Sequence, residues 1–177
     1  HSLRVAGCCE EILDQTMEQY HMGWLLGILH DNKEQNPVLF SERIDWVLQD
    51  LTPQEQKKMK NYIDVLTSNK AEGKGEQKRQ QLIKIETMEL IPSWILVFDK
   101  LDNCRRFKKN PCGKSKEELD GYFAVAFLIF TKARSRHKEI REFMIQETRK
   151  FYETMGEELG GVEGAKKIAE RYFKKFE

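Results

Sequence analysis

The sequence is organised around an uninterrupted apolar run at residues 122–130, in which no position is left to face water. A helix that is apolar on every side has to be covered on every side. The run is about half of the roughly 20 residues that a membrane-spanning helix needs, so it predicts a buried core helix. Ser115 and Glu118 just upstream fit a capping box, and Ala124 and Ala126 favour a helix over the alternative, a buried strand.

Apolar residues recur at spacings of three and four along most of the remaining chain, which is typical of helices with one buried face. We therefore predict an all-α protein of seven or eight antiparallel-packed helices around a buried central helix at about residues 119–131. An irregular bundle and a stack of helix pairs both fit this pattern. The helices are expected at about residues 9–30, 41–51, 52–66, 82–90, 94–107, 115–131, 135–158 and 162–177.

Several helix boundaries have local signals. Residues 52–55, Thr-Pro-Gln-Glu, place Thr at the N-cap, Pro at the first helical position and Glu at the third, the most specific helix start in the chain. Ser41 is predicted to cap the preceding helix, after a turn at residues 36–37. Pro92 is expected to separate two helices, because it lacks an N–H and biases Ile91 toward an extended backbone.

Residues 67–81 contain no large apolar side chain. Such a segment buries too little surface to offset the entropy of ordering it, so we expect a mobile loop at about residues 67–81. It is also the one plausible domain boundary. Because the 66 residues before it would make a marginal fold alone, we expect residues 1–177 to form a single helical domain that contains this loop.

The composition favours a soluble, helix-rich protein of the cytoplasm or nucleus. The chain is 40% hydrophobic and 33% charged, with no apolar run of membrane length. A core of this size needs no disulfides and no glycosylation sequon is present, so we expect reduced cysteines at positions 8, 9, 104 and 112. A secreted, disulfide-linked helical bundle remains the alternative, because an even number of cysteines permits two bridges.

The net charge of +1 hides an uneven distribution. Residues 1–66 hold 6 Lys and Arg against 11 Asp and Glu, whereas residues 100–141 hold 12 against 5. An asymmetry of this kind concerns binding partners and not the fold. The basic residues fall in two clusters on either side of the predicted core helix. We expect them to bind an anion or a partner; they are Arg105, Arg106, Lys108, Lys109, Arg134, Arg136, Lys138 and Arg141.

A core helix of about 16 residues would span about 24 Å, which places the two basic clusters at its opposite ends. They would then belong to different surfaces. The alternative interpretation is that these side chains are solvated, or that they pair with acidic residues within the fold. No aromatic residues interleave the second cluster, which argues against stacking on single-stranded bases.

No catalytic pattern stands out. Residues 113–115, Gly-Lys-Ser, end like a phosphate-binding loop, but position 108 is Lys where that motif needs Gly. The histidines and cysteines show no zinc spacing and no nucleophile context. We expect no cofactor and no metal site, and enzyme is the least supported class.

The sequence therefore favours a non-enzymatic helical module for protein–protein interaction or scaffolding, alone or as part of a larger protein. The alternative function is binding of an anionic partner, nucleic acid or acidic lipid headgroups, through the basic 100–141 region. Trp24, Trp46 and Trp94 are candidates for a protein-binding surface, since Trp is enriched at interface hot spots. Each lies on an apolar stripe, so packing in the core is the expected role.

Substituting Val125→Asp tests the position of the core helix. We expect the variant to lose its cooperative melt, because it buries an unpaired charge in the centre of the apolar run. Thermal unfolding followed by circular dichroism measures this. A cooperative transition close to that of the wild type would show that the central helix is misplaced.

Overall fold

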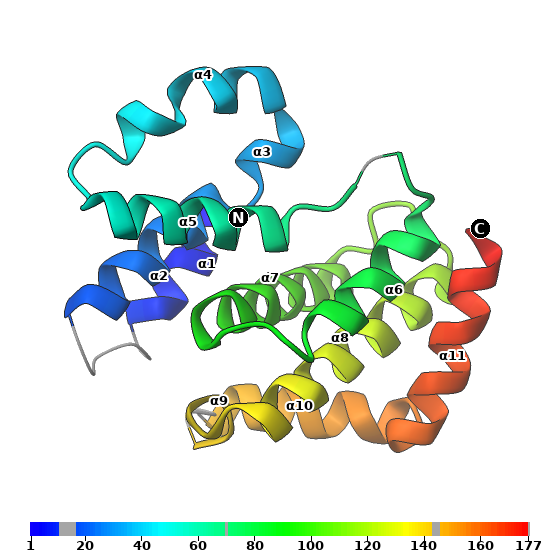
Figure 1. The fold of residues 1–177 in the computed structure, drawn as a ribbon. Helices are drawn as coiled ribbons and strands as arrows, with labels where there is room; N and C mark the ends of the chain where they lie inside the picture. Colours follow the sequence, from blue (N-terminus) through cyan, green and yellow to red (C-terminus); the bar gives the residue numbers. More distant parts are fainter. Residues whose placement is uncertain (11–16, 70, 143–145, 177) are drawn as a thin grey trace. The chain divides into compact units, whose positions relative to one another are not determined.

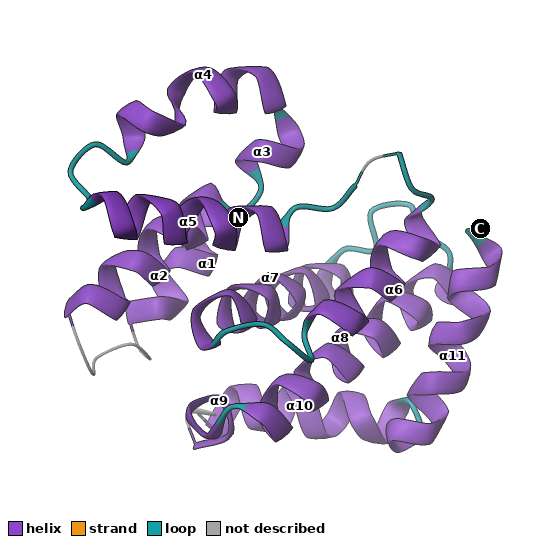
Figure 2. Cartoon of the chain, in the orientation of Figure 1, coloured by secondary structure: helices purple, strands orange, loops and turns teal. Residues whose placement is uncertain are grey.

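The computed structural model describes residues 1–10, 17–69, 71–142 and 146–176. The described residues contain helices and turns but no strand, so the all-α prediction is confirmed (Figures 1 and 2). They form more helices than the seven or eight expected, because several are short: α1 (Ser2–Glu10), α2 (Met17–Leu29), α3 (Asn32–Gln35), α4 (Pro37–Val47), α5 (Pro53–Leu66), α6 (Lys74–Lys84), α7 (Leu90–Lys109), α8 (Lys116–Arg136), α9 (Lys138–Glu142), α10 (Gln146–Glu158) and α11 (Gly161–Lys175).

The chain divides into two compact units. The first unit comprises His1–Lys70 and Glu89–Leu96, and the second comprises Ala71–Met88 and Val97–Glu177. The chain first passes from one unit to the other between residues 70 and 71, within the segment 67–81 that the sequence indicated as the one plausible boundary. Helix α7 begins in the first unit and ends in the second.

The second unit is built on α8, as the apolar run predicts. The capping box is present: the Ser115 hydroxyl accepts from the N–H of Glu118, and the Glu118 carboxylate accepts from the N–H of Ser115. Every residue from Ala124 to Phe130 is buried. Helix α11 packs along α8, and α6 and α10 also contact it. Among the described residues no helix is both long and apolar enough to cross a lipid bilayer.

The closest approach of α11 to α8 depends on Gly121. A Cβ atom there would overlap the ring of Tyr172, so a larger residue would push the two helices apart. Helix α10 contacts α8 through Tyr152, whose ring stacks on Phe127 at 4.8 Å between centroids and meets Phe130 edge-on at 4.5 Å. These aromatic contacts cover the side of α8 that α11 leaves open.

Helix α6 corrects the prediction of a loop at 67–81, because residues 74–81 are helical and, of the described residues, only 67–69 and 71–73 lie outside a helix. The segment is ordered by contacts that do not require large apolar residues of its own. Gly75 is buried against the backbone of Phe173 in α11, and the guanidinium of Arg79 lies 5.2 Å from the centre of the Phe173 ring. Arg79 also pairs with Glu76 one turn earlier, at 2.8 Å.

In the first unit, α1 packs on α2 at a close approach of Gly27 to Ala6. A Cβ atom at Gly27 would lie 2.7 Å from the Cα of Ala6. The sequence predicts one helix over about 9–30; the structure has α1 and α2, and residues 11–16 lie outside the described part of the chain. The fully buried side chains of this unit include Val5, Leu26, Leu48, Met59 and Ile63.

Of the three other helix boundaries predicted from local signals, one was right and two were wrong. Thr52 and Glu55 form the predicted capping box of α5. Helix α4 begins four residues before Ser41: Asn36 is the N-cap, with its side chain accepting from the N–H of Leu39 at 3.1 Å. Pro92 lies inside the first turn of α7, where a missing N–H is tolerated, so it does not separate two helices.

The segments after the core also differ from the prediction. Residues 82–84 end α6 instead of starting a helix that reaches residue 90. Helix α8 continues to Arg136, and the predicted long helix at 135–158 is described as the short α9 and as α10, with residues 143–145 outside the described part. The last amphipathic helix is confirmed as α11, which begins at Gly161 with Gly160 as its N-cap, both at positive φ.

The α6–α11 contact predicts a measurable cost for Gly75→Ala. The added methyl group would overlap the carbonyl oxygen of Phe173, and neither backbone can move cheaply, so we expect a loss of about 1–3 kcal/mol in the free energy of unfolding. The matched control is Gly7→Ala in α1, where the methyl group meets nothing within 4 Å and helix propensity gains up to about 1 kcal/mol. Urea denaturation of both variants tests this, and a Gly75→Ala variant as stable as Gly7→Ala would contradict the described packing.

Candidate functional site

Helix α4 carries an apolar surface that its own unit does not cover. Of its residues only Ile44 is buried. Three of the seven large exposed hydrophobic side chains in the described chain lie on it: Val38 (67% exposed), Leu39 (40%) and Trp46 (70%). Exposed hydrophobic residues scattered singly are ordinary, whereas a group of them on one short helix makes that helix a candidate interaction surface.

The spacing of α4 explains why part of its apolar surface is left over. Phe40, Ile44 and Val47 are four and three residues apart, so they form one stripe along the helix, and this stripe faces the unit. Leu39, Arg43 and Trp46 repeat the same spacing one position earlier and form a second stripe beside the first, more exposed to solvent. The first unit therefore packs against one stripe and leaves the other exposed to solvent.

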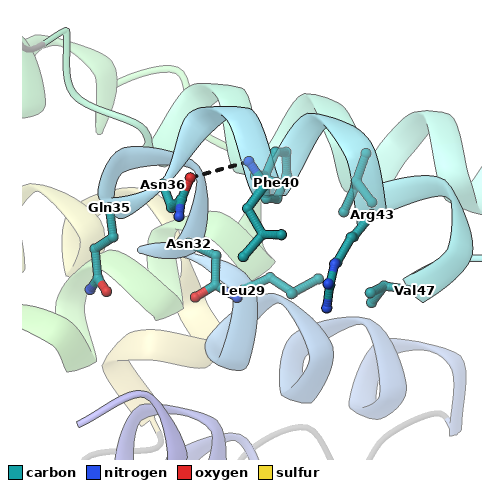
Figure 3. Close-up of a pocket in the computed structure, with 9 residues that line it drawn as sticks. Leu29, Asn32, Gln35, Asn36, Phe40, Arg43 and Val47 are labelled. Carbon is teal, nitrogen blue, oxygen red and sulfur yellow. Dashed lines mark hydrogen bonds between the residues drawn. The ribbon is translucent and has the colours of Figure 1, made fainter.

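A pocket of about 260 Å³ lies beneath α4 (Figure 3). Its volume is below the roughly 300–1,000 Å³ of small-molecule sites, so it suits one side chain of a partner better than a free ligand. Its lining comes from the end of α2, from α3 and from α4: Leu29, Asn32, Gln35, Asn36, Leu39, Phe40, Arg43, Ile44 and Val47. We call this pocket together with the exposed stripe of α4 the α4 groove.

Arg43 gives the α4 groove its charge. Its side chain runs from α4 toward Leu29, with Val47 beside it (Figure 3). Arg43 is exposed and forms no ion pair or hydrogen bond with any part of the chain that the structure describes. A carboxylate brought into the α4 groove could therefore pair with it without displacing an internal partner.

Polar contacts attach the walls of the α4 groove to α5 and to the segment that follows it. Lys33 of α3 forms an ion pair with Asp64, and Asp45 of α4 forms one with Lys60. The Glu34 carboxylate accepts from the N–H of Ser68 at 3.4 Å. These exposed pairs contribute little stability individually, and their effect is to fix where α3 and α4 lie within the unit.

The three tryptophans differ in solvent exposure, which the sequence could not indicate. Trp94 is 3% exposed, as expected for a side chain packed in the core. Trp24 is partly covered, with 37% of its surface exposed. For Trp46 that expectation was wrong. The sequence analysis also missed Arg43, although its position four residues after Leu39 and three before Trp46 was a signal that could have been followed.

Most of the predicted basic residues have partners inside the second unit. At the end of α7, Arg105 donates to the hydroxyl of Thr148 at 3.1 Å and Lys108 pairs with Glu158 at 2.9 Å. Both cations also lie over the ring of Phe151. Arg106 donates to the side chain of Asn103. This part of the basic region holds α10 against α7.

At the end of α8 the basic residues cap α6 and contact aromatic rings. Arg136 donates to the carbonyl oxygens of Glu86 and Met88, and Lys132 donates to that of Leu82 at 3.0 Å. Cations are favoured near such carbonyl groups by the helix dipole. The Arg134 guanidinium lies 5.2 Å from the centre of the Tyr152 ring.

The remaining residues of the basic 100–141 region add little to a common anion-binding surface. Lys138 pairs with Glu142 in α9. Burial lowers the pKa of His137, against the opposing effect of its hydrogen bond to the carbonyl oxygen of Met88. The first cluster ends α7, and Arg134 and Arg136 lie in the last turn of α8, whose 21 residues span about 30 Å. Binding of an anion by these residues stays a prediction.

A second pocket, of about 340 Å³, lies in the second unit between α8 and α11. Its lining mixes charges of both signs with Ile168 and Tyr172. Lys116 pairs with Asp120, and Glu117 pairs with Lys175 of α11 at 2.6 Å. Three of the four charged side chains in its lining are therefore paired within the unit, and Arg171 is the fourth, so the pocket offers a ligand fewer unpaired charges than its lining suggests.

The chain matches no known protein family, no curated protein and no solved structure.

Trp46→Ala should hardly change the stability of the protein, whereas Trp94→Ala should lower it strongly. We expect the free energy of unfolding of Trp46→Ala to stay within about 0.5 kcal/mol of wild type, because the side chain is exposed. Trp94→Ala empties a core position and should cost about 3–5 kcal/mol. Equal losses in urea denaturation would show that Trp46 supports the fold and does not belong to a binding surface.

Proposed function

We propose that this chain is a protein–protein interaction module whose α4 groove binds an amphipathic helix of a partner protein. The partner helix would place an apolar side chain in the pocket and a carboxylate beside Arg43. This specifies the interaction function that the sequence favours by giving it a surface and a type of partner.

The observation that carries the proposal is the exposed stripe Leu39, Arg43 and Trp46 next to a pocket of side-chain size. Trp and Arg are the residue types most enriched among interface hot spots, and hot spots cluster around desolvated pockets. An apolar stripe left in water costs free energy that a partner would recover on covering it.

A helix is the partner element that fits this surface. Helix α4 is about 16 Å long, which matches about three turns of a second helix lying along it. Packed helices lie about 8–10 Å apart and interlock through residues at spacings of three and four, the spacing of the exposed stripe. Recognition would then follow the helix-in-groove mode.

Arg43 supports a partner with an acidic residue. Among the described residues that line the α4 groove it is the one cation. A charge pair inside an otherwise apolar contact selects among partners more than it adds affinity. The polar rim of Asn32 and Gln35 can hydrogen-bond around it without adding net charge.

The two alternative functions have less support. Binding of nucleic acid or acidic lipid headgroups would draw on Lys109 and Arg141, which are exposed, because most other cations of the 100–141 region have internal partners. Cys104 and Cys112 form no disulfide, so they do not support the alternative of a secreted, disulfide-linked helical bundle.

A displayed library of helical peptides of about 16 residues, selected against the immobilised chain, tests the proposal. We expect the enriched peptides to be amphipathic and to carry Asp or Glu within their apolar stripe. Fluorescence anisotropy should show that Trp46→Ala weakens their binding about 30-fold, as for a hot spot of about 2 kcal/mol.

Arg43→Glu tests the charge. It should weaken binding of the acidic peptides, and a peptide with Lys in place of its acidic residue should bind Arg43→Glu better than it binds the wild type. Ile83→Ala, at an exposed apolar position on α6, is the matched control and should bind as the wild type does. A library with no enriched peptides, or enriched peptides that bind Trp46→Ala unchanged, would contradict the proposal.

A further inference from the structure

Three potential metal ligands meet in the first unit at the corner between α2 and α3. They are the imidazoles of His1 and His30 and the carboxylate of Asp31, and one ligand atom from each lies within 4.8 Å of the others. The Nε2 atom of His30 is 3.3 Å from Oδ2 of Asp31, and the Nε2 atom of His1 is 4.0 Å from the same oxygen. No other such group is found among the described residues.

The chain positions these groups from two separate segments. His30 and Asp31 follow the last residue of α2, and His1 precedes α1. The close approach of Gly27 to Ala6 brings α1 against α2. The carbonyl oxygen of His1 accepts from the N–H of Arg4 at 2.9 Å, which fixes the start of α1. The sequence showed no metal spacing because the ligands are 29 residues apart.

His30 is oriented as a metal ligand is. It is 6% exposed, and its Nδ1 lies 2.7 Å from the carbonyl oxygen of Gly27. A carbonyl oxygen only accepts, so Nδ1 carries a proton, and Nε2 on the other side of the ring is directed toward Asp31. Ligating histidines in proteins are held in this way, with the second ring nitrogen donating to a backbone carbonyl.

The Asp31 side chain points toward the two imidazoles and does not cap the helix that follows it. It occupies the N-cap of α3, where an aspartate side chain normally accepts from the backbone, but it makes no capping hydrogen bond. Its carboxylate faces both histidines instead. The side chains of His1 and Asp31 are partly exposed, at 23% and 32%, so a metal ion can reach them and they can adjust around it.

We propose that His1, His30 and Asp31 bind a divalent transition-metal ion, with Zn²⁺ as the best-matched ion. Two imidazole nitrogens and one carboxylate oxygen suit Zn²⁺ and its first-row neighbours and not Ca²⁺ or Mg²⁺, which need oxygen ligands. Tetrahedral bonds of about 2.0–2.1 Å separate ligand atoms by about 3.4 Å, so the group has to contract by about 1 Å. Three protein ligands leave one position of the ion open to water or to a further ligand.

The test is a titration of the tag-free chain with Zn²⁺ in competition with a chromophoric chelator, with Co²⁺ absorption as the readout of coordination. We expect one ion per chain, and a Tm that rises with Zn²⁺ because the ion binds the folded state. Asp31→Asn and His1→Gln should each weaken binding at least about 10-fold. His1→Gln keeps the backbone at position 1, so its effect reports the imidazole.

The matched control is His21→Gln, at an exposed histidine of α2 outside the group, which should bind Zn²⁺ as the wild type does. Circular dichroism of each variant shows whether it is folded before its binding is compared. Absence of binding to the folded wild type at about 100 µM Zn²⁺, or binding that Asp31→Asn and His1→Gln leave unchanged, would overturn the proposal and leave an ordinary imidazole–carboxylate contact.

Discussion

The second unit depends on covering α8 from every side. The run from Ala124 to Phe130 has no face that water can tolerate, so the helices packed on it must meet without a gap. This requirement explains features that look unrelated in the sequence. Gly121 and Gly75 allow backbones to approach, Tyr152 fills the side next to α10, and the polar helix α6 is ordered by what it packs against. Many of the basic residues serve the same end, because they tie the covering helices together.

The first unit shows the opposite situation. Helix α4 has apolar residues over a wider arc than its unit buries, and Trp46 is exposed where the same residue type at position 94 is enclosed. We propose that a partner covers this exposed surface. The proposed metal group lies at the corner where α2 leads into α3, next to Leu29 and Asn32 of the α4 groove. Both features therefore gather around one short stretch of chain.

The sequence predicts what is decided locally. The capping boxes at Thr52 and Ser115 were found because their hydrogen bonds join residues three apart, and the core helix was found because its apolar run excludes a solvent face. It could not predict the order of α6, whose contact with Phe173 joins residues about a hundred positions apart, or the partners of Arg105 and Arg136. The spacing of α4 showed a stripe, but whether a stripe is covered is a tertiary property.

Native-state hydrogen exchange tests the central claim, that the fold depends on α8 and leaves α4 available, most directly. The amides of residues 124–130 should exchange only when the second unit unfolds as a whole, whereas those of α4 should exchange through local opening at a lower free energy. The difference should persist at low denaturant concentration, where global unfolding is rare. Amides of α4 that are as strongly protected as those of α8 would contradict this account, because α4 would then be held by its own fold.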